Sequence, residues 1–366
     1  MENADWIITM QHTTLILNAV EFSRAETLLA EHGALKVFAH RYASGVAALR
    51  ITNPVGEIIM LPFHGQQIWD AKFYNRRLTM RSMFDEPVNS GDYLSNYGGF
   101  LLHCGATAMG NPGPQDSHPL HGELPNAIYQ KAQLTFGQAE HGAYVEVSGN
   151  YRHTVAFTHN YQAEPSIRMN EKNGRLAMQL EVKNLKATPM DVMYLAHVNF
   201  KPVDGAVLID TASDDPEKVN VRDKFPEFFK PTPEYLTFIK AIQKRPELHR
   251  EMTKGKTFDP ELVMGLTFKS DKQGWAHSMQ AHPDGAADFI SHRPAELPRG
   301  VRWITRTPNQ DAIGIYLPAT AEANGYTAEK AKGNVLTLDA GQSFKCSLEF
   351  GALNQKDASE MKQMIK

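Results

Sequence analysis

The most regular feature of the chain is an alternation of apolar and polar residues over several short segments. Every second residue is apolar in residues 176–182 and again in residues 344–350, and residues 262–268 place four large apolar side chains on one side. Successive side chains of a strand point to opposite faces of a sheet, so each segment would bury one face and expose the other. The pattern predicts half-buried β-strands.

Further strands are predicted at residues 143–148 and 312–317, and the second is almost wholly apolar, which is typical of a strand buried on both faces. The turn residues 339–342 separate residues 335–338 from residues 344–350 and predict a hairpin near the C-terminus. Short connections between half-buried strands favour antiparallel sheets packed face to face. We therefore expect an all-β fold, a large antiparallel β-sandwich with a few short helices.

Helical signals are few. Ser23 and Glu26 have the spacing of a capping box, and Gly33 is placed to end a short helix after them. Residues 234–244 carry apolar side chains at helical spacing before Pro246, and a last helix is expected after Asp357.

Residues 218–258 are rich in charge and proline and interrupt the strand pattern. We interpret them as an insertion in the sandwich, because no segment of the chain has the composition of a linker between domains. The expectation is a single domain over residues 1–366.

The amino-acid composition excludes several classes of protein. Of 366 residues, 42% are hydrophobic and 22% charged, with a formal net charge of −3. This excludes a mostly disordered chain and gives no overall attraction to nucleic acid or to an anionic membrane. No apolar run approaches the roughly 18 residues that cross a bilayer, and the N-terminus carries acids where a secretory signal needs positive charge. We expect a cytoplasmic protein; the sequence specifies no oligomeric state.

Cysteine and histidine usage differ sharply, with 2 cysteines against 15 histidines. Cys104 and Cys346 form no closely spaced pair, so each is expected to fill a core position. Arg76, Arg77 and Arg81 form a small basic patch that we interpret as part of the surface. Arg81 is a candidate to bind a phosphate or carboxylate of a substrate.

The densest polar cluster is residues 116–123, which contain His118, His121 and Glu123 and follow a stretch rich in glycine and proline. Two imidazoles and a carboxylate can act as acid, base or metal ligands. The alternative is a polar surface loop, since a His-x-x-His spacing is weakly specific.

Two further regions could carry chemistry. His197 ends an apolar strand, where a lone histidine is usually a satisfied core residue. The small-residue loop after the 312–317 strand contains Glu322, and a loop leaving a rigid strand can hold a carboxylate over a cleft.

Several motifs follow one another in a recognisable order. They are Leu-Pro-Phe-His-Gly-Gln-Gln-Ile-Trp-Asp at 61–70, Tyr-Gly-Gly-Phe at 97–100 with Cys104 and Gly105, His-Pro-Leu-His-Gly at 118–122, His-Val-Asn-Phe at 197–200 and Leu-Asp-Ala-Gly-Gln-Ser at 338–343. In this order the sequence resembles the aldose 1-epimerase (galactose mutarotase-like) superfamily, in an uncharacterised branch. The resemblance covers about residues 37–353 and leaves residues 1–36 as an N-terminal extension.

The resemblance implies a supersandwich fold with an open cleft for a sugar. In the family a base takes the proton of the anomeric hydroxyl while an acid protonates the ring oxygen, and α and β anomers interconvert through the open chain. No metal or organic cofactor takes part. By this resemblance we expect the partner to be a small-molecule sugar or sugar derivative.

Site residues follow by matching motifs. The resemblance makes His197 the general acid and His121 a residue that holds and polarises the sugar. Asn199 and His118 would also bind substrate, and His103 would take the space where better-known members have an arginine.

One position departs from the family. The glutamate that serves as base falls, by register, on Leu317, which cannot accept a proton. Glu322 or Glu123 could replace it, and an enzyme acting at the anomeric centre remains the leading interpretation.

Two alternatives stay open. With Leu317 in place of the base, the protein could bind a carbohydrate without turning it over. Alternatively, His118, His121 and Glu123 resemble part of the ligand set of a cupin-like metal-dependent enzyme, although their spacing departs from the alternate strand positions that cupins use.

Overall fold

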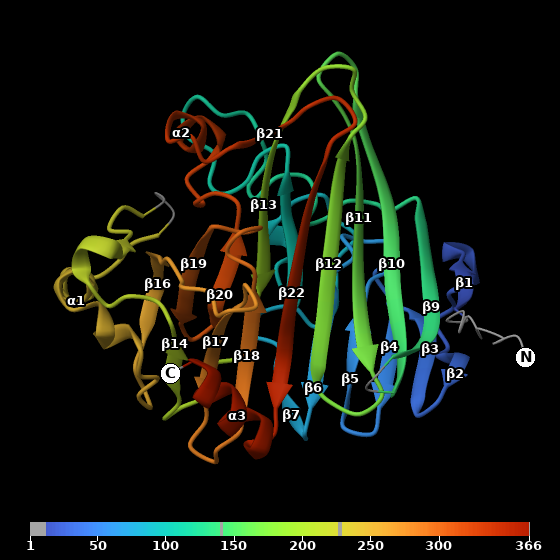
Figure 1. The fold of residues 1–366 in the computed structure, drawn as a ribbon, viewed down its shortest axis with the longest axis horizontal. Helices are drawn as coiled ribbons and strands as arrows, with labels where there is room; N and C mark the ends of the chain where they lie inside the picture. The colour runs from blue at the N-terminus through green and yellow to red at the C-terminus, as the bar shows by residue number, and fades with distance from the viewer. Residues whose placement is uncertain (1–11, 140–141, 226–228, 366) are drawn as a thin grey trace, which may run out of the picture.

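The computed structural model describes residues 12–139, 142–225 and 229–365. Two large antiparallel sheets make up most of these residues and lie face to face (Figure 1). The predicted all-β sandwich is confirmed.

The first sheet has nine strands. In spatial order they are β1 (Thr13–Leu17), β9 (Lys131–Ala139), β10 (Gly142–Val155), β11 (His159–Asn170), β12 (Arg175–Asn184), β22 (Ser343–Leu353), β18 (Ala287–His292), β17 (Ala276–Ala281) and β14 (Val207–Asp210).

The second sheet has thirteen strands. In spatial order they are β15 (Asn220–Val221), β16 (Phe258–Gly265), β19 (Arg299–Arg306), β20 (Asp311–Ala319), β13 (Met190–Val198), β8 (Leu101–Ala106), β6 (Ile68–Phe73), β5 (Gly56–Met60), β4 (Ala47–Asn53), β3 (Leu35–Arg41) and β2 (Thr27–His32), with β21 (Leu336–Leu338) paired to β13 and β7 (Arg76–Arg77) paired to β6.

Helices are short and lie outside the sheets (Figure 1). The α-helices are α1 (Pro233–Lys244), α2 (Tyr326–Ala331) and α3 (Gln355–Ile365), and the 3-10 turns are η1 (Ala19–Glu21), η2 (Leu94–Asn96), η3 (Pro216–Lys218) and η4 (Pro246–His249). Thr232 caps α1 by accepting a hydrogen bond from the backbone N–H of Tyr235. None of the helices in the described residues is long and apolar enough to cross a membrane.

The main core fills the space between the two sheets, and strand alternation builds it. In β12, Leu176, Met178, Leu180 and Val182 are buried while Gln179 is exposed. A second apolar cluster, which includes Leu102, Cys104, Leu195, Trp303 and Leu317, lies on the other face of the thirteen-stranded sheet. Both cysteines are buried and unpaired, as expected of core residues.

Two local predictions are wrong. Residues 27–32, expected in a helix capped at Ser23, form strand β2, which pairs with β3 across a turn at Gly33. Pairing along the sheet edge outweighs the weak local capping signal. The predicted terminal hairpin is also absent from the described residues: β21 pairs with β13 in one sheet and β22 with β12 and β18 in the other, so the turn at 339–342 crosses between sheets.

The described parts of the segment 218–258, residues 218–225 and 229–258, contain α1, η4 and the two-residue strand β15, which extends the edge of the thirteen-stranded sheet beside β16. The helix predicted at 234–244 and the one after Asp357 are both confirmed as α1 and α3. The segment brings Arg222 to the cavity described next.

Candidate functional site

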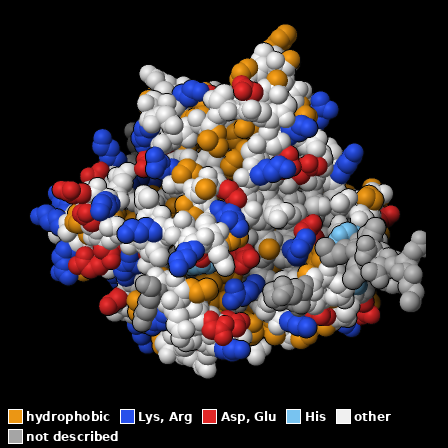
Figure 2. All heavy atoms as spheres, viewed as in Figure 1, with side chains coloured by type: hydrophobic (Ala, Val, Ile, Leu, Met, Phe, Trp, Pro, Cys, Tyr) orange, Lys and Arg blue, Asp and Glu red, His pale blue; other side chains and the backbone are white. Residues whose placement is uncertain are grey.

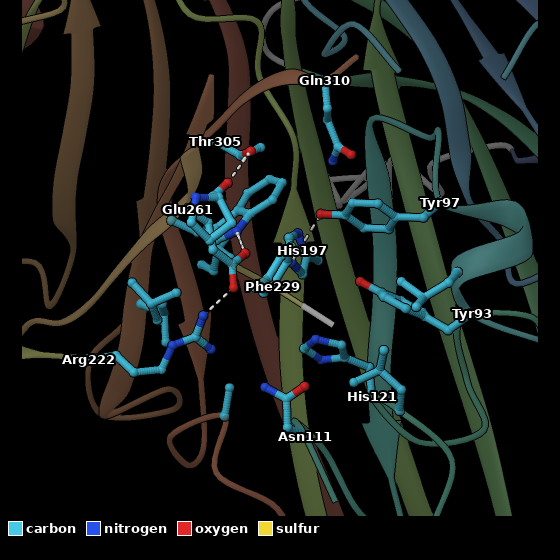
Figure 3. Close-up of a pocket in the computed structure, with 18 of the residues that line it drawn as sticks. Tyr93, Tyr97, Asn111, His121, His197, Arg222, Phe229, Glu261, Thr305 and Gln310 are labelled. Carbon is cyan, nitrogen blue, oxygen red and sulfur yellow. Dashed lines mark hydrogen bonds and ion pairs between the residues drawn. The ribbon is translucent and has the colours of Figure 1, made fainter. Parts of the chain in front are cut away.

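A cavity of about 260 Å³ lies on the face of the thirteen-stranded sheet that is turned away from the main core (Figure 3). Strands β13, β20, β19 and β16 supply its floor, and loops supply its sides. The lining residues used below are Tyr93, Tyr97, Asn111, His121, His197, Arg222, Asp259, Glu261, Trp303 and Leu317.

Alternation along the strands decides which side chains face this cavity. In β13, Tyr194 and Ala196 point into the main core, so His197 points to the cavity. In β16, Leu262 is fully buried in the core, and its neighbour Glu261 therefore faces the cavity. The same geometry places Trp303 of β19 there.

A hydrogen bond to Asn199 fixes the orientation of the His197 ring. The Nδ2 of Asn199 donates to the carbonyl oxygen of Gly99 at 3.0 Å, so its Oδ1 faces His197 and accepts from Nδ1–H at 2.6 Å. The neutral ring then carries its lone pair on Nε2, which lies 3.4 Å from the hydroxyl of Tyr97. Asn199 thus orients the imidazole from behind and does not itself line the cavity.

Aromatic rings enclose His197. The rings of Tyr97 and Trp303 meet it edge-on, with centroids 5.5 and 5.2 Å away. Burial lowers the pKa of His197 to about 4, against the opposing effect of the hydrogen bond to Asn199. The imidazole is therefore neutral at pH 7 in the free protein.

His121 approaches His197 from the neighbouring loop, with ring centroids 5.7 Å apart, and stacks against Tyr93 at 4.8 Å. Burial, and then the charges of His197, His118 and Arg222, lower its pKa to about 3. Its Nδ1 is buried with no hydrogen-bond partner among the described residues. Figure 3 shows Tyr93, Tyr97 and His121 along one wall and Arg222 and Glu261 along the wall facing it.

Glu261 also lines the cavity, although no motif in the sequence singles it out. Its Oε2 accepts a hydrogen bond from Nε1 of Trp303 at 2.5 Å, and its Oε1 forms an ion pair with Arg222. The alternation in residues 262–268 predicts a strand with one apolar side that begins at Leu262, and the residue before Leu262 then points to the opposite face.

Leu317, the position assigned to the missing family glutamate, does line the cavity and is 2% exposed. The two carboxylates expected to replace it do not. Glu322 forms an ion pair with Lys332 at 2.6 Å and accepts from Asn324. Sequence proximity to β20 did not bring it over the cleft, because the loop turns away toward α2.

Glu123 lies in a separate polar cluster. It accepts hydrogen bonds from the backbone N–H groups of Ala106 and Thr107 and from the hydroxyl groups of Thr107 and Tyr161. These contacts tie the loop to β8 and β11 and leave the carboxylate away from the cavity. Its role in the structure is to anchor the loop that carries His121.

His118 and His103 also lie elsewhere. His118 lines a separate groove, where its Nε2 accepts from the backbone N–H of Tyr326. His103 is fully buried in the main core, 2.8 Å from the Tyr194 hydroxyl, because it pairs with Ala196 and so shares its face of the sheet.

Arg81 is on the surface and donates to the carbonyl oxygens of Thr307 and Pro308. It braces a loop at the rim and does not line the cavity.

The three side chains of the cupin-like alternative, His118, His121 and Glu123, have three different surroundings. Within the described residues, no group of three or more His, Cys, Asp or Glu side chains is placed to hold a metal ion.

The loop carrying His121 depends on Gly122. Its φ is +82°, and an added Cβ would lie 2.3 Å from the carbonyl oxygens of Ala108 and Gly105. We expect Gly122→Ala to destabilise the fold by roughly 2–4 kcal/mol, combining left-handed strain with overpacking. Gly341→Ala is the matched control, because Gly341 has a φ of +77° but nothing within 4 Å. Urea unfolding of both variants measures the difference; equal losses would contradict the crowding argument.

Solved structures of other proteins share the fold of this chain. A Klebsiella pneumoniae protein proposed to be an aldose 1-epimerase is similar over 97% of this chain and 95% of its own, with a TM-score of 0.82 at 18% identity. A galactose mutarotase-like protein from Clostridium acetobutylicum is similar over 88% of this chain and 99% of its own, with a TM-score of 0.59 at 15% identity. At such identities the likeness shows the galactose mutarotase-like fold. No curated protein matches the chain.

One family matches the sequence itself, over residues 43–352, which include the cavity and both of its histidines. The chain belongs to this family, which is described as "Domain of unknown function (DUF4432)".

Proposed function

We propose that the cavity binds a monosaccharide and interconverts its α and β anomers by proton transfer at the anomeric centre. The observation that carries the proposal is the placement of His197, whose Nδ1–H is engaged by Asn199 and whose Nε2 side faces an aromatic-lined cavity. An imidazole held in one tautomer can exchange a proton at one defined atom.

The size of the cavity supports a single sugar ring. About 260 Å³ lies just below the roughly 300–1,000 Å³ of sites for drug-sized ligands. Trp303, Tyr93 and Tyr97 offer apolar surfaces, while Asn111 and Gln310 offer amide groups among the lining residues. This mixture suits a molecule with one apolar face and a rim of hydroxyl groups.

Charge in the cavity favours a neutral sugar. Among the described lining residues the ionic side chains are Arg222, Glu261 and Asp259, two carboxylates to one guanidinium. That guanidinium is already paired with Glu261. A phosphate or carboxylate on the substrate would meet no unpaired cation from these residues.

His197 is one of the two proton-transfer groups that ring opening needs. In its protonated form, Nε2 donates to the ring oxygen as the C1–O5 bond breaks and recovers the proton when the ring recloses on the other face. His121 borders the same space and would hold a hydroxyl group. The reaction transfers protons and breaks and re-forms the C1–O5 bond, and it requires no oxidant or reductant.

A panel of neutral aldoses, sugar phosphates and uronic acids tests the substrate class. Because a ligand that binds only the native state raises the melting temperature, we expect at least one neutral aldose to do so and to show faster anomer exchange with the protein than in buffer. A shift confined to the acidic sugars would contradict the class.

A second function, carbohydrate binding without turnover, is favoured by Leu317 at the expected glutamate position in the cavity wall. It predicts a melting-temperature shift with a neutral aldose, no exchange above the buffer rate, and no effect of His197→Asn on affinity.

A further inference from the structure

Glu261, a carboxylate that the sequence motifs do not assign, lines the same cavity as His197 but lies on another strand. Glu261 lies on β16, while the position that resemblance gives to the base, Leu317, lies on β20, two strands away across β19. Both side chains line the same cavity. Leucine at one position leaves Glu261 and Asp259 as the only carboxylates among the described residues of the lining.

Trp303 links Glu261 to His197. Its Nε1–H donates to Glu261 at 2.5 Å, and its ring lies 5.2 Å from the imidazole centroid of His197. The carboxylate and the imidazole therefore contact the same indole. The negative charge of Glu261 also contributes to raising the pKa of the Tyr97 hydroxyl, after burial and Cys104, and this hydroxyl lies 3.4 Å from Nε2 of His197.

The carboxylate is held firmly on its far side. Arg222 forms an ion pair with Oε1, and the indole N–H binds Oε2, so both oxygens have a donor. Each carboxylate oxygen has two lone-pair sites, so both can still accept a hydrogen bond from a ligand. A side chain fixed in this way is positioned before substrate arrives, as proton transfer requires.

Asp259 is the less suitable carboxylate. It precedes Pro260 at the start of β16, and its side chain forms no hydrogen bond or ion pair with the described residues that would fix it against the cavity. The donors of Arg222 and Trp303 both converge on Glu261.

We infer that Glu261 is the general base that partners His197, supplied from β16 in place of the carboxylate absent at Leu317. This inference rests on the proposed function. In the ring-opening step a carboxylate oxygen of Glu261 takes the proton of the anomeric hydroxyl, C1=O forms, the C1–O5 bond breaks, and O5 takes the proton of His197 Nε2. After rotation about C1–C2, both protons return and the ring closes as the other anomer. Arg222 and Trp303 are positioning residues.

The test compares Glu261→Gln with Glu322→Gln. Glutamine keeps the size of Glu261 and an oxygen that accepts a hydrogen bond, but it cannot take up a proton. We expect kcat for anomer exchange to fall about 10²–10⁴-fold, while the neutral aldose still raises the melting temperature. Glu322 lies outside the cavity in an ion pair with Lys332, so Glu322→Gln is expected to exchange at the wild-type rate.

Trp303→Phe keeps the proposal testable if Glu261→Gln does not fold. Phenylalanine retains an aromatic ring beside His197, although a smaller one, and removes the N–H that orients Glu261, so we expect kcat to fall about tenfold with a smaller change in KM. An unchanged kcat in the folded variant would overturn the assignment.

The outcomes separate this inference from the proposed function. If wild type exchanges anomers and Glu261→Gln does so at a similar rate, the inference fails and the function stands. A fall in Glu322→Gln as large as in Glu261→Gln also overturns it. If the wild type exchanges no sugar faster than buffer, both fail.

Discussion

Replacing His197 with asparagine is expected to lower anomer exchange about 10²–10⁴-fold, the usual contribution of a positioned acid or base. The asparagine amide can still donate to Oδ1 of Asn199, as Nδ1–H of His197 does at 2.6 Å, but it has no group at the position of Nε2. The loss should therefore fall on kcat more than on the affinity for the sugar. Exchange NMR on the purified variant measures it.

The same substitution at His118 is the control. His118 belongs to the same sequence motif as His121 but faces a separate groove, so His118→Asn is expected to retain the wild-type rate. Equal losses in the two variants would show that the effect comes from the fold and not from proton transfer.

Wild-type exchange should also depend on pH in a defined direction. The pKa of His197 is lowered to about 4, so above that value the imidazolium fraction falls about tenfold per pH unit. If His197 donates the proton to the ring oxygen, the enzyme-dependent rate falls as the pH rises from 6 to 8. A rate that rises over this interval would assign His197 the opposite role.

The second large effect is loss of stability in acid. His103, His249 and His292 are at most 1% exposed, and burial lowers their pKa values to about 4, 3 and 3. An unfolded histidine titrates near 6.5, so below that pH the unfolded chain binds protons that the native protein excludes. The contribution of these three neutral histidines to the free energy of unfolding is full above pH 6.5 and decreases as the pH falls toward 4.

Each such histidine lowers the free energy of unfolding by about 1.4 kcal/mol per pH unit within its window. Three together remove about 4 kcal/mol per unit, against a typical total of 5–15 kcal/mol. We therefore expect the protein to unfold between about pH 5.5 and 3. Urea unfolding at a series of pH values measures the slope; a constant free energy of unfolding between pH 7 and 5 would contradict the prediction.

His292→Phe isolates one of these groups. The His292 ring packs against Phe268 and Tyr316, with centroids 5.5 and 4.7 Å away, and its Nδ1 has no partner among the described residues. Phenylalanine keeps the ring contacts and cannot bind a proton. The dependence of stability on pH should become shallower by about one proton below pH 6.

Strands could be predicted from the alternation of apolar and polar residues, because a half-buried strand places successive side chains in the core and in solvent. This succeeded for β12, β20 and β22. It failed where partners far along the chain decide the outcome. Residues 27–32 form an edge strand despite the capping signal at Ser23, and the turn at 339–342 passes between sheets.

The candidate site was predictable only in part. Motif order pointed to His121 and His197, and the structure brings their rings to 5.7 Å. Proximity to a motif in the sequence favours Glu322 and Glu123 as the carboxylate, but neither lines the cavity. Local sequence does not link Glu261 to His197, because the two residues lie on different strands and both contact Trp303 on a third strand. The spatial order of the thirteen strands cannot be deduced from the spacing of residues within one segment.

The central claim is that this cavity interconverts sugar anomers. Two-dimensional exchange NMR between the α and β anomeric protons of neutral aldoses, with wild type and His197→Asn at equal concentrations, tests it most directly. The account predicts cross-peaks that grow with the concentration of wild-type protein for at least one neutral aldose and fall to the buffer level with His197→Asn. Cross-peaks no stronger than in buffer for every aldose, sugar phosphate and uronic acid tested would contradict it.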